Sequence, residues 1–329
     1  MMKPAQRAQN LPPLFFATLN KRIAELRAAG ADIINLDAGS PDLPPDPRLI
    51  DTLKRNADDP AKHNYGGYAG QPHLRQAIID YYGRRFGVEL DNTDLLPLIG
   101  SKEGIVNMHL AWLDPGDLSL IPDPCYPAYL FAPMLAGGHT ERFPLLAERG
   151  WLPNLADIPS DTAAAARMLW LNYPNNPTGG TATVEFFAEA VDFCRQFDLL
   201  LCHDAPYADV TFDGHIAPSV LQAPGAKDVA IEFNSLSKTY SLAGWRLGMA
   251  VGNPVAVEAL AKVKTQIDSG IAKPVQDMAA DALTGDQSWL EPRNAIYRER
   301  RDMCLATLRA MGLETTHPKG GLYVWFRVP

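Results

Sequence analysis

Short apolar runs alternate with amphipathic stretches along most of the chain, and this pattern predicts both strands and helices. Unbroken apolar runs indicate buried strands, whereas apolar residues that recur every three or four positions indicate helices. The expected strands are 33–36, 118–121, 168–171, 199–202, 229–233, 247–251 and 322–326, and the expected helices include 72–86, 183–197 and most of 254–311. Alternation of this kind predicts an α/β domain with a mostly parallel sheet.

The ends of several elements are marked by residues that favour caps or turns. Apolar residues repeat at helical spacing between 19 and 26, and Gly30 is placed to end that helix. Thr183 is the predicted N-cap of the helix that follows it. Prolines crowd residues 39–47, so this stretch is predicted to be irregular and to connect an N-terminal segment to the main domain.

Composition and charge narrow the class of protein. The chain has 329 residues and a net charge of -8 at pH 7, which argues against a nucleic-acid-binding protein. Its four cysteines form no C-x-x-C pair, which predicts a reduced, cytoplasmic protein. Residues 1–6 lack the apolar core of a signal peptide, and no apolar run suggests a membrane span. A metal site at Cys202-His203-Asp204 would need further ligands from elsewhere, and a buried strand end is the alternative.

A lysine, a serine and an arginine between residues 235 and 246 suit one particular cofactor. Lys238 offers an amine that can form a Schiff base with a carbonyl group. Ser235 and Arg246 offer a hydroxyl and a guanidinium that can hold a phosphate dianion. A cofactor that is both an aldehyde and a phosphate ester needs this set, and pyridoxal 5'-phosphate (PLP) is that cofactor.

Four more candidates follow predicted strands, where ligands of α/β sheets bind. Asp204 can pair with the protonated pyridine nitrogen of PLP, although a turn or a helix cap is the alternative. Tyr207 and Asn176 can donate hydrogen bonds to the phenolate oxygen of PLP, and for Asn176 the alternative is a purely structural turn. Tyr126 can stack on the pyridine ring, or it is a core tyrosine.

A second phosphate-binding element is predicted at residues 100–104, Gly-Ser-Lys-Glu-Gly, which open a helix. The backbone amides of Ser101 and Lys102 at this helix start can hold a phosphate. The chain has no Walker A loop, and no G-x-G-x-x-G follows a predicted strand, so a nicotinamide-dependent enzyme loses support.

With these motifs in place, the chain resembles the class I/II aminotransferases of PLP fold type I. The most specific motifs are Asn176-Pro177-Thr178-Gly179, Asp204-x-x-Tyr207 and Ser235-x-x-Lys238 with Arg246. Wider stretches, such as 202–207 and 232–240, are most similar to the LL-diaminopimelate aminotransferases. The resemblance implies a large domain with a mostly parallel seven-stranded sheet between helices, and a smaller α+β domain that is incomplete at its C-terminus. The implied domains are 1–45 (N-terminal arm and part of the small domain), 46–270 (large PLP-binding domain) and 271–329 (small domain).

The resemblance also implies a role for each candidate residue. Lys238 is the Schiff-base lysine, Asp204 is the pyridinium partner, and Asn176 and Tyr207 are the donors to the phenolate oxygen. Ser101, Lys102, Ser235 and Arg246 match phosphate-binding positions, and Tyr126 matches the stacking ring. Tyr65 matches a tyrosine that reaches the phosphate of a neighbouring subunit, which implies a homodimer, and Gly39 matches a backbone contact to the substrate carboxylate. No metal is expected.

The implied activity is a ping-pong transfer of an amino group between an L-amino acid and a 2-oxo acid. LL-diaminopimelate, glutamate and aspartate are the candidate donors, and neither nucleic acid nor a membrane is an expected partner. A PLP-dependent C–S β-lyase or decarboxylase of the same fold, and a non-catalytic truncated PLP-fold protein, stay open as alternatives. The family continues beyond the position of Trp325 with an arginine for the substrate carboxylate, and we do not assign that role to Arg327.

Overall fold

The computed structural model describes residues 2–13, 15–37 and 39–328, and the chain divides into two units, Met1–Ser40 and Pro41–Pro329. The first unit contains helices α1 (Gln6–Asn10) and α2 (Phe15–Ala28), neither of which has a buried residue. Gly30 follows α2 with a φ of +89°, so the predicted helix end is confirmed. Because this division falls after Ser40, our boundaries at 45 and 270 stay predictions.

The strand predicted at residues 33–36 is wrong. These residues have no regular secondary structure and form no ladder, and Ile34 and Leu36 are 81% and 93% exposed. A strand is held by hydrogen bonds to a neighbouring strand, and the described part of this unit contains no other strand to pair with. A four-residue stretch with three apolar residues was therefore not enough to form one.

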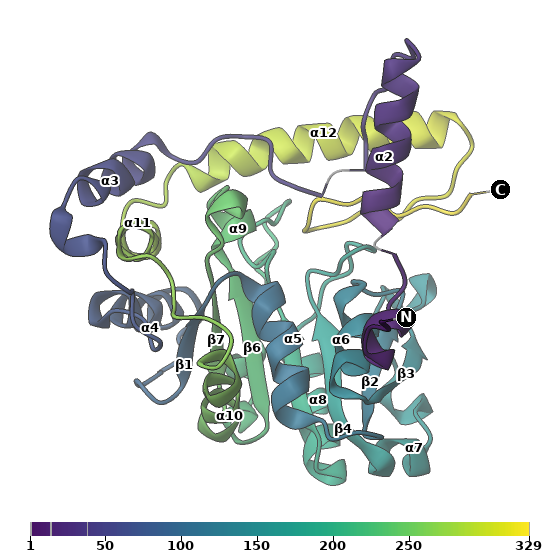
Figure 1. Cartoon of the computed structure of the whole chain (residues 1–329). Coiled ribbons are helices and arrows are strands. Elements are labelled where there is room, and N and C mark those ends of the chain that lie inside the picture. The colour runs from purple at the N-terminus through teal and green to yellow at the C-terminus, as the bar shows by residue number, and fades with distance from the viewer. Residues whose placement is uncertain (1, 14, 38, 329) are drawn as a thin grey trace. The chain divides into compact units, whose positions relative to one another are not determined.

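Seven strands in the described part of the second unit form one sheet (Figure 1). They are β1 (Leu95–Leu98), β2 (Leu118–Asp123), β3 (His139–Pro144), β4 (Ala166–Asn172), β5 (Leu200–Asp204), β6 (Ala230–Ser235) and β7 (Gly248–Gly252). Their order is β1-β7-β6-β5-β4-β2-β3. The pairs from β3 to β6 are parallel, and β7 runs antiparallel to both β1 and β6. The predicted seven-stranded, mostly parallel sheet is confirmed.

Both faces of the sheet are buried, because successive residues of the central strands point into different cores. In β4, Leu169 and Leu171 belong to one core, and Met168 and Trp170 belong to the other. The first core also contains side chains of α4 (Pro72–Phe86), α8 (Val184–Phe197) and α11 (Lys273–Thr284), and the second contains side chains of α5 (Ser101–Trp112), α6 (Ala128–Ala136) and α10 (Pro254–Lys264). Helices therefore cover both faces of the sheet. A ligand-binding site is expected at the ends of the strands, which the helices leave uncovered.

Two predicted helices begin and end where their capping residues indicate. α4 spans the predicted 72–86, and Gly87 follows it with a φ of +66°. Thr183 caps α8, because its Oγ1 accepts a hydrogen bond from the Phe186 nitrogen at 3.3 Å. The other α-helices of this unit are α3 (Pro47–Ala57), α7 (Ser160–Ala165), α9 (Leu236–Thr239) and α12 (Leu290–Ala310).

The strand predicted at residues 322–326 is also wrong. Within this stretch only Phe326 pairs among the described residues, by an isolated antiparallel bridge to Thr315, and Gly320 just before it makes another to Thr211. Such bridges do not continue into a ladder with a neighbouring strand. No helix in the described ranges is long and apolar enough to cross a membrane.

Candidate active site

The predicted site residues gather where three neighbouring strands end. Asp204 is the last residue of β5, and Ser235 is the last residue of β6. Tyr207 follows β5 by three residues, Asn176 follows β4 by four, and Lys238 lies on the short helix α9 directly after β6. Since β4, β5 and β6 are adjacent and parallel, their carboxyl ends lie at one edge of the sheet. Ligands of open α/β sheets bind at this edge.

Asp204 is a buried carboxylate with one occupied oxygen and one unoccupied oxygen. The Tyr129 hydroxyl donates to Oδ2 at 2.6 Å, and the Asn172 side chain donates to the Asp204 carbonyl at 2.7 Å. Oδ1 is buried and has no hydrogen-bond partner among the described residues. Burial raises the pKa of Asp204 to about 6, and the Tyr129 bond opposes that rise. A buried carboxylate oxygen without a donor is unfavourable, so Oδ1 fits a ligand that brings a cationic N–H.

Tyr129 was missed by the sequence analysis, although its position carries a signal. It lies three residues after Tyr126, and the two rings meet edge to face with centroids 5.7 Å apart. Tyr129 also stacks on Trp170 of β4 at 5.2 Å. Burial and then the Asp204 charge raise the pKa of Tyr126 to about 12, which places Tyr126 near that carboxylate. Aromatic residues one helical turn apart after a strand were the available clue.

Lys238 has an unusually acidic ammonium group. It lies half-buried on α9, and its Nζ is 5.9 Å from the centroid of the Tyr207 ring. Burial and then the positive charge of Arg246 lower the pKa of Lys238 to about 8. An amine in this range is partly neutral near physiological pH, as a nucleophile or a general base must be.

The start of α5 and Arg246 lie against each other. Gly100 caps α5 with a φ of +88°, and a Cβ at this position would collide with the Arg246 guanidinium. A Cβ at Gly248 of β7 would lie 2.8 Å from the Ser101 nitrogen, so this strand also approaches the helix start closely. First-turn amides, here including those of Ser101 and Lys102, and a nearby guanidinium together suit an anion such as phosphate.

Ser235 has a local structural role in this structure. Its Oγ accepts a hydrogen bond from the Ser237 nitrogen and donates one to the Leu247 carbonyl, both at 3.2 Å. Ser235 thus caps α9, the helix that carries Lys238. A hydrogen bond from Ser235 to a phosphate would require its hydroxyl to leave the Leu247 carbonyl, so its predicted role stays a prediction.

Tyr65 lies on an exposed loop of the second unit, and Gly39 lies in the first unit. Tyr65 is 83% exposed, and the loop that carries it is fastened by Gln276. The Gln276 side chain donates to the Gly66 carbonyl at 3.0 Å and accepts from the Gln71 nitrogen at 2.6 Å. Gly39 belongs to the first unit, and its predicted contact with a substrate carboxylate stays a prediction.

His203, which precedes Asp204, is bonded inside the core. Its Nδ1 lies 2.8 Å from Oε2 of Glu232, and both side chains are fully buried. The Tyr82 and Ser219 hydroxyls also donate to Glu232, at 2.7 and 2.8 Å. These contacts support the strand-end interpretation of the Cys202-His203-Asp204 sequence.

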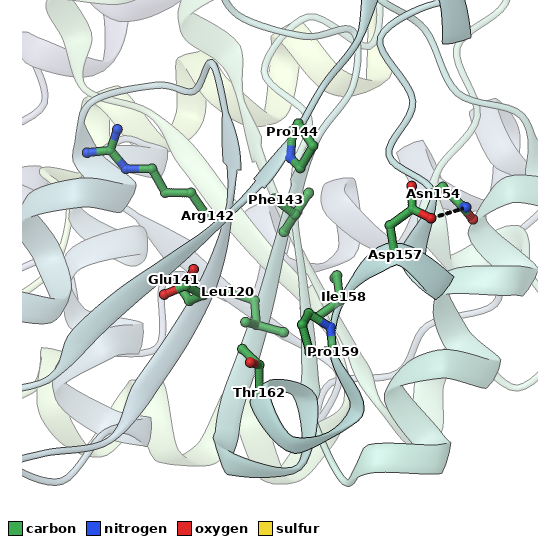
Figure 2. Close-up of a pocket in the computed structure, with 10 residues that line it drawn as sticks. All are labelled: Leu120, Glu141, Arg142, Phe143, Pro144, Asn154, Asp157, Ile158, Pro159 and Thr162. Carbon is green, nitrogen blue, oxygen red and sulfur yellow. Dashed lines mark hydrogen bonds between the residues drawn. The ribbon is translucent and has the colours of Figure 1, made fainter.

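A separate cavity of about 100 Å³ lies beside the edge strand β3 (Figure 2). Glu141 and Arg142 of β3 line it together with Asn154, Asp157 and Thr162. Asn154 donates to Asp157 at 2.7 Å, so part of the polar lining is already paired. None of the predicted site residues lines this cavity, and the strand-end group remains the candidate site.

Comparison with known proteins agrees with this geometry. Residues 31–329 match the family of class I and II aminotransferases. An LL-diaminopimelate aminotransferase of Moorella thermoacetica is 48% identical over 329 residues, which cover 100% of this chain and 84% of that protein. LL-diaminopimelate aminotransferase 2 of a Nostoc species is 46% identical over 330 residues, which cover 100% of this chain and 85% of that protein.

Solved structures give the same result. Substrate-bound BacF from Bacillus subtilis superimposes with a TM-score of 0.95 at 33% identity, covering 100% of this chain and 84% of that one. A probable N-succinyldiaminopimelate aminotransferase from Thermus thermophilus gives a TM-score of 0.90 at 36% identity, covering 95% of this chain and 84% of that one.

Proposed function

Because the chain belongs to the class I and II aminotransferases, which are PLP enzymes of fold type I, we propose that it binds PLP and transfers the amino group of LL-diaminopimelate to a 2-oxo acid. The reaction class follows from the family. The donor is inferred from the names of relatives that are 46–48% identical, and 2-oxoglutarate is the proposed acceptor. The observation that carries the proposal is the buried Oδ1 of Asp204, which has no hydrogen-bond partner in the described part of the chain and lies at the strand ends that also hold Lys238.

The chain's residues fit each part of PLP in turn. Asp204 Oδ1 would accept the hydrogen bond of the ring nitrogen, and the Tyr126 ring would stack on the pyridine. The phosphate would bind at the first turn of α5, with Arg246 beside it and Ser235 as a further donor. Lys238 would hold the aldehyde carbon covalently. Asn176 and Tyr207 would donate to the phenolate oxygen.

Lys238 is the proposed proton carrier of the reaction. When bound, PLP supplies an electron sink that stabilises negative charge on the Cα of the attached amino acid. Once the amino group of the substrate has taken its place at the aldehyde carbon, the Lys238 amine would remove the Cα proton as a base and, as an acid, deliver it to that carbon. With a pKa of about 8, about a tenth of this amine is neutral at pH 7. Asp204 would stay ionised beside a cationic ring nitrogen, because a neighbouring cation lowers a carboxyl pKa.

We further propose a homodimer in a reducing, cytoplasmic compartment. Tyr65 would reach the phosphate of the neighbouring subunit, and its 83% exposure on a fastened loop supports that role. Gly39 would contact the substrate carboxylate. The location is proposed from the cysteine pattern, and the domain boundaries at 45 and 270 are proposed from the family resemblance.

An amino-transfer assay tests the proposal. Purified protein with PLP is incubated with 2-oxoglutarate and either LL-diaminopimelate or aspartate, and the glutamate formed is quantified. We expect glutamate from LL-diaminopimelate in preference to aspartate, and no turnover by Lys238→Ala. Lys262→Ala, a matched change at a 73% exposed lysine of α10, should keep full activity.

Three outcomes would contradict the proposal. Turnover by the Lys238→Ala variant would remove the central role of this amine. Preference for aspartate would overturn the proposed donor. Release of pyruvate and a thiol from an amino acid with a β-thioether, or of carbon dioxide from an amino acid, without any 2-oxo acid would identify a C–S β-lyase or a decarboxylase instead.

A further inference from the structure

Residues 319–321 pair with residues 210–212 beside the strand ends. Two backbone hydrogen bonds, of 2.8 and 2.9 Å, and an isolated antiparallel bridge join the two segments. The first segment leads directly to Tyr323, and the second follows Tyr207 by three residues. Gly320 is packed so closely that a Cβ there would lie 2.8 Å from a Pro174 side-chain carbon. The pairing therefore fixes the position of Tyr323 relative to Tyr207.

The hydroxyls of Tyr207 and Tyr323 lie 2.8 Å apart, within hydrogen-bond distance. Their rings meet edge to face, with centroids 5.8 Å apart and planes at 82°. Tyr207 is 2% exposed and belongs to a small apolar cluster that Tyr323 packs against. Burial raises the pKa of both hydroxyls, so both are protonated at neutral pH. The pair is thus a hydrogen bond between two neutral phenols.

The number of protons decides the direction of this bond when a cofactor is present. A tyrosine hydroxyl has one proton to donate and two lone pairs that accept. If the Tyr207 hydroxyl donates its one hydrogen bond to an anionic oxygen of the cofactor, it can only accept a hydrogen bond from the Tyr323 hydroxyl. A hydrogen bond accepted by a hydroxyl polarises it and strengthens the bond that it donates.

We propose that Tyr323 is a positioning residue that orients the Tyr207 hydroxyl toward the phenolate oxygen of PLP and strengthens that donor. This inference rests on the proposed function, which supplies the role of Tyr207. Tyr323 acts through Tyr207 and does not need to touch the reacting atoms.

A double-mutant cycle tests the inference. The four proteins are wild type, Tyr323→Phe, Tyr207→Phe and the double variant, each loaded with PLP. The measurements are the pH midpoint of the visible absorption band and the dissociation constant for PLP by equilibrium dialysis. A weaker donor stabilises the deprotonated phenolate oxygen less. We therefore expect Tyr323→Phe to raise the midpoint by about 0.5 to 1 pH unit and to weaken PLP binding roughly three- to tenfold. With Phe at 207, the change at 323 should add nothing.

Tyr297→Phe is the matched control, because this ring packs in the same apolar cluster and its hydroxyl is not bonded to Tyr207. It should keep the wild-type midpoint. A wild-type midpoint in Tyr323→Phe, or a shift that persists with Phe at 207, would overturn the inference while the proposed function stands. Absence of any visible band in the wild-type protein would instead overturn the proposed function and this inference together.

Discussion

Tyr129→Phe is the sharpest single change that the candidate site offers. It removes the hydroxyl that donates to Asp204 Oδ2 at 2.6 Å, between two buried side chains. The ring remains and keeps its stacking on Trp170. The variant therefore differs from wild type by one hydrogen bond to a buried carboxylate.

The expected size of the effect follows from that bond. A hydrogen bond to a charged group contributes about 1.5–3 kcal/mol, which corresponds to about one to two pKa units. The pKa of Asp204 is about 6 with the bond present. Without it, we expect a pKa of about 7 to 8, so that Asp204 is half to mostly protonated at pH 7 when no cofactor is bound.

The contribution of Asp204 to folding stability decreases as pH rises. The pKa of Asp204 in the folded protein, about 6, lies above the ordinary 3.8. Between these values the unfolded chain releases the proton first, so the stability contributed by this group falls as pH rises through about 4 to 6. In the Tyr129→Phe variant, the stability contributed by Asp204 keeps decreasing up to about pH 7 to 8. The total decrease is about 1.5–3 kcal/mol larger than in wild type.

The assay is urea unfolding of the cofactor-free protein at one fixed protein concentration, between pH 4.5 and 8.5. Wild type, Tyr129→Phe, Asp204→Asn and the double variant form a cycle. We expect Tyr129→Phe to cost about 1.5–3 kcal/mol more at the high end of this range than at the low end. This pH-dependent part should vanish when residue 204 is Asn.

Tyr82→Phe is the matched control, because it removes an equally buried hydroxyl that donates to Glu232 at 2.7 Å. Its cost should be the same with Asp or Asn at position 204. A Tyr129→Phe cost that does not change with pH, or one whose pH dependence survives Asp204→Asn, would refute the reasoning.

Two further predictions concern the phosphate end of the site and the lysine. Gly100→Ala places a methyl group against the Arg246 guanidinium at a φ of +88°, and we expect roughly tenfold weaker PLP binding by dialysis. Gly87→Ala, at φ +66° and ψ +24° with open space around it, carries less backbone strain than Gly100→Ala at φ +88° and ψ +151°, and it should leave the affinity unchanged; equal effects would contradict the contact with Arg246. In the cofactor-free protein, labelling of Lys238 by an amine reagent should rise with pH around a midpoint of about 8. Arg246→Leu should move that midpoint upward, because it removes a nearby positive charge. A wild-type midpoint near the ordinary 10.5 would contradict the lowered pKa of Lys238.

The central strands were predictable because strands buried on both faces consist of nearly unbroken apolar runs. β4, β5 and β6 each contain a largely apolar stretch, at 168–171, 199–202 and 229–233, and the sequence indicates each of them. β3 has the sequence His-Thr-Glu-Arg-Phe-Pro and lies at the edge of the sheet, where most of its side chains are exposed. β1 is four residues long and contains Pro97. β3 therefore lacks the apolar pattern of a buried strand, whereas β1 is apolar and fully buried but contains a proline, which disfavours a strand interior.

The same rule explains the two wrong strands. An apolar run shows that a segment can pair, but the neighbour that it would pair with is set by the tertiary fold. Residues 33–36 and 322–326 have the run without a continuous neighbour among the described residues.

The site was predictable only as far as single residues carry chemistry. Asp204 and Lys238 were indicated because a carboxylate and an amine follow buried strands. Tyr129 and Tyr323 reach the site from elements far away in sequence, and their side-chain partners depend on packing. Ser235 was predicted from a motif that does not reveal its cap on α9.

The most direct test of the whole account is the visible absorbance of the purified protein with PLP, recorded before and after addition of LL-diaminopimelate. The account predicts a visible band that depends on Lys238, bleaches when LL-diaminopimelate is added, and returns with 2-oxoglutarate. A protein that forms no band, or a band that LL-diaminopimelate leaves unchanged, would contradict it.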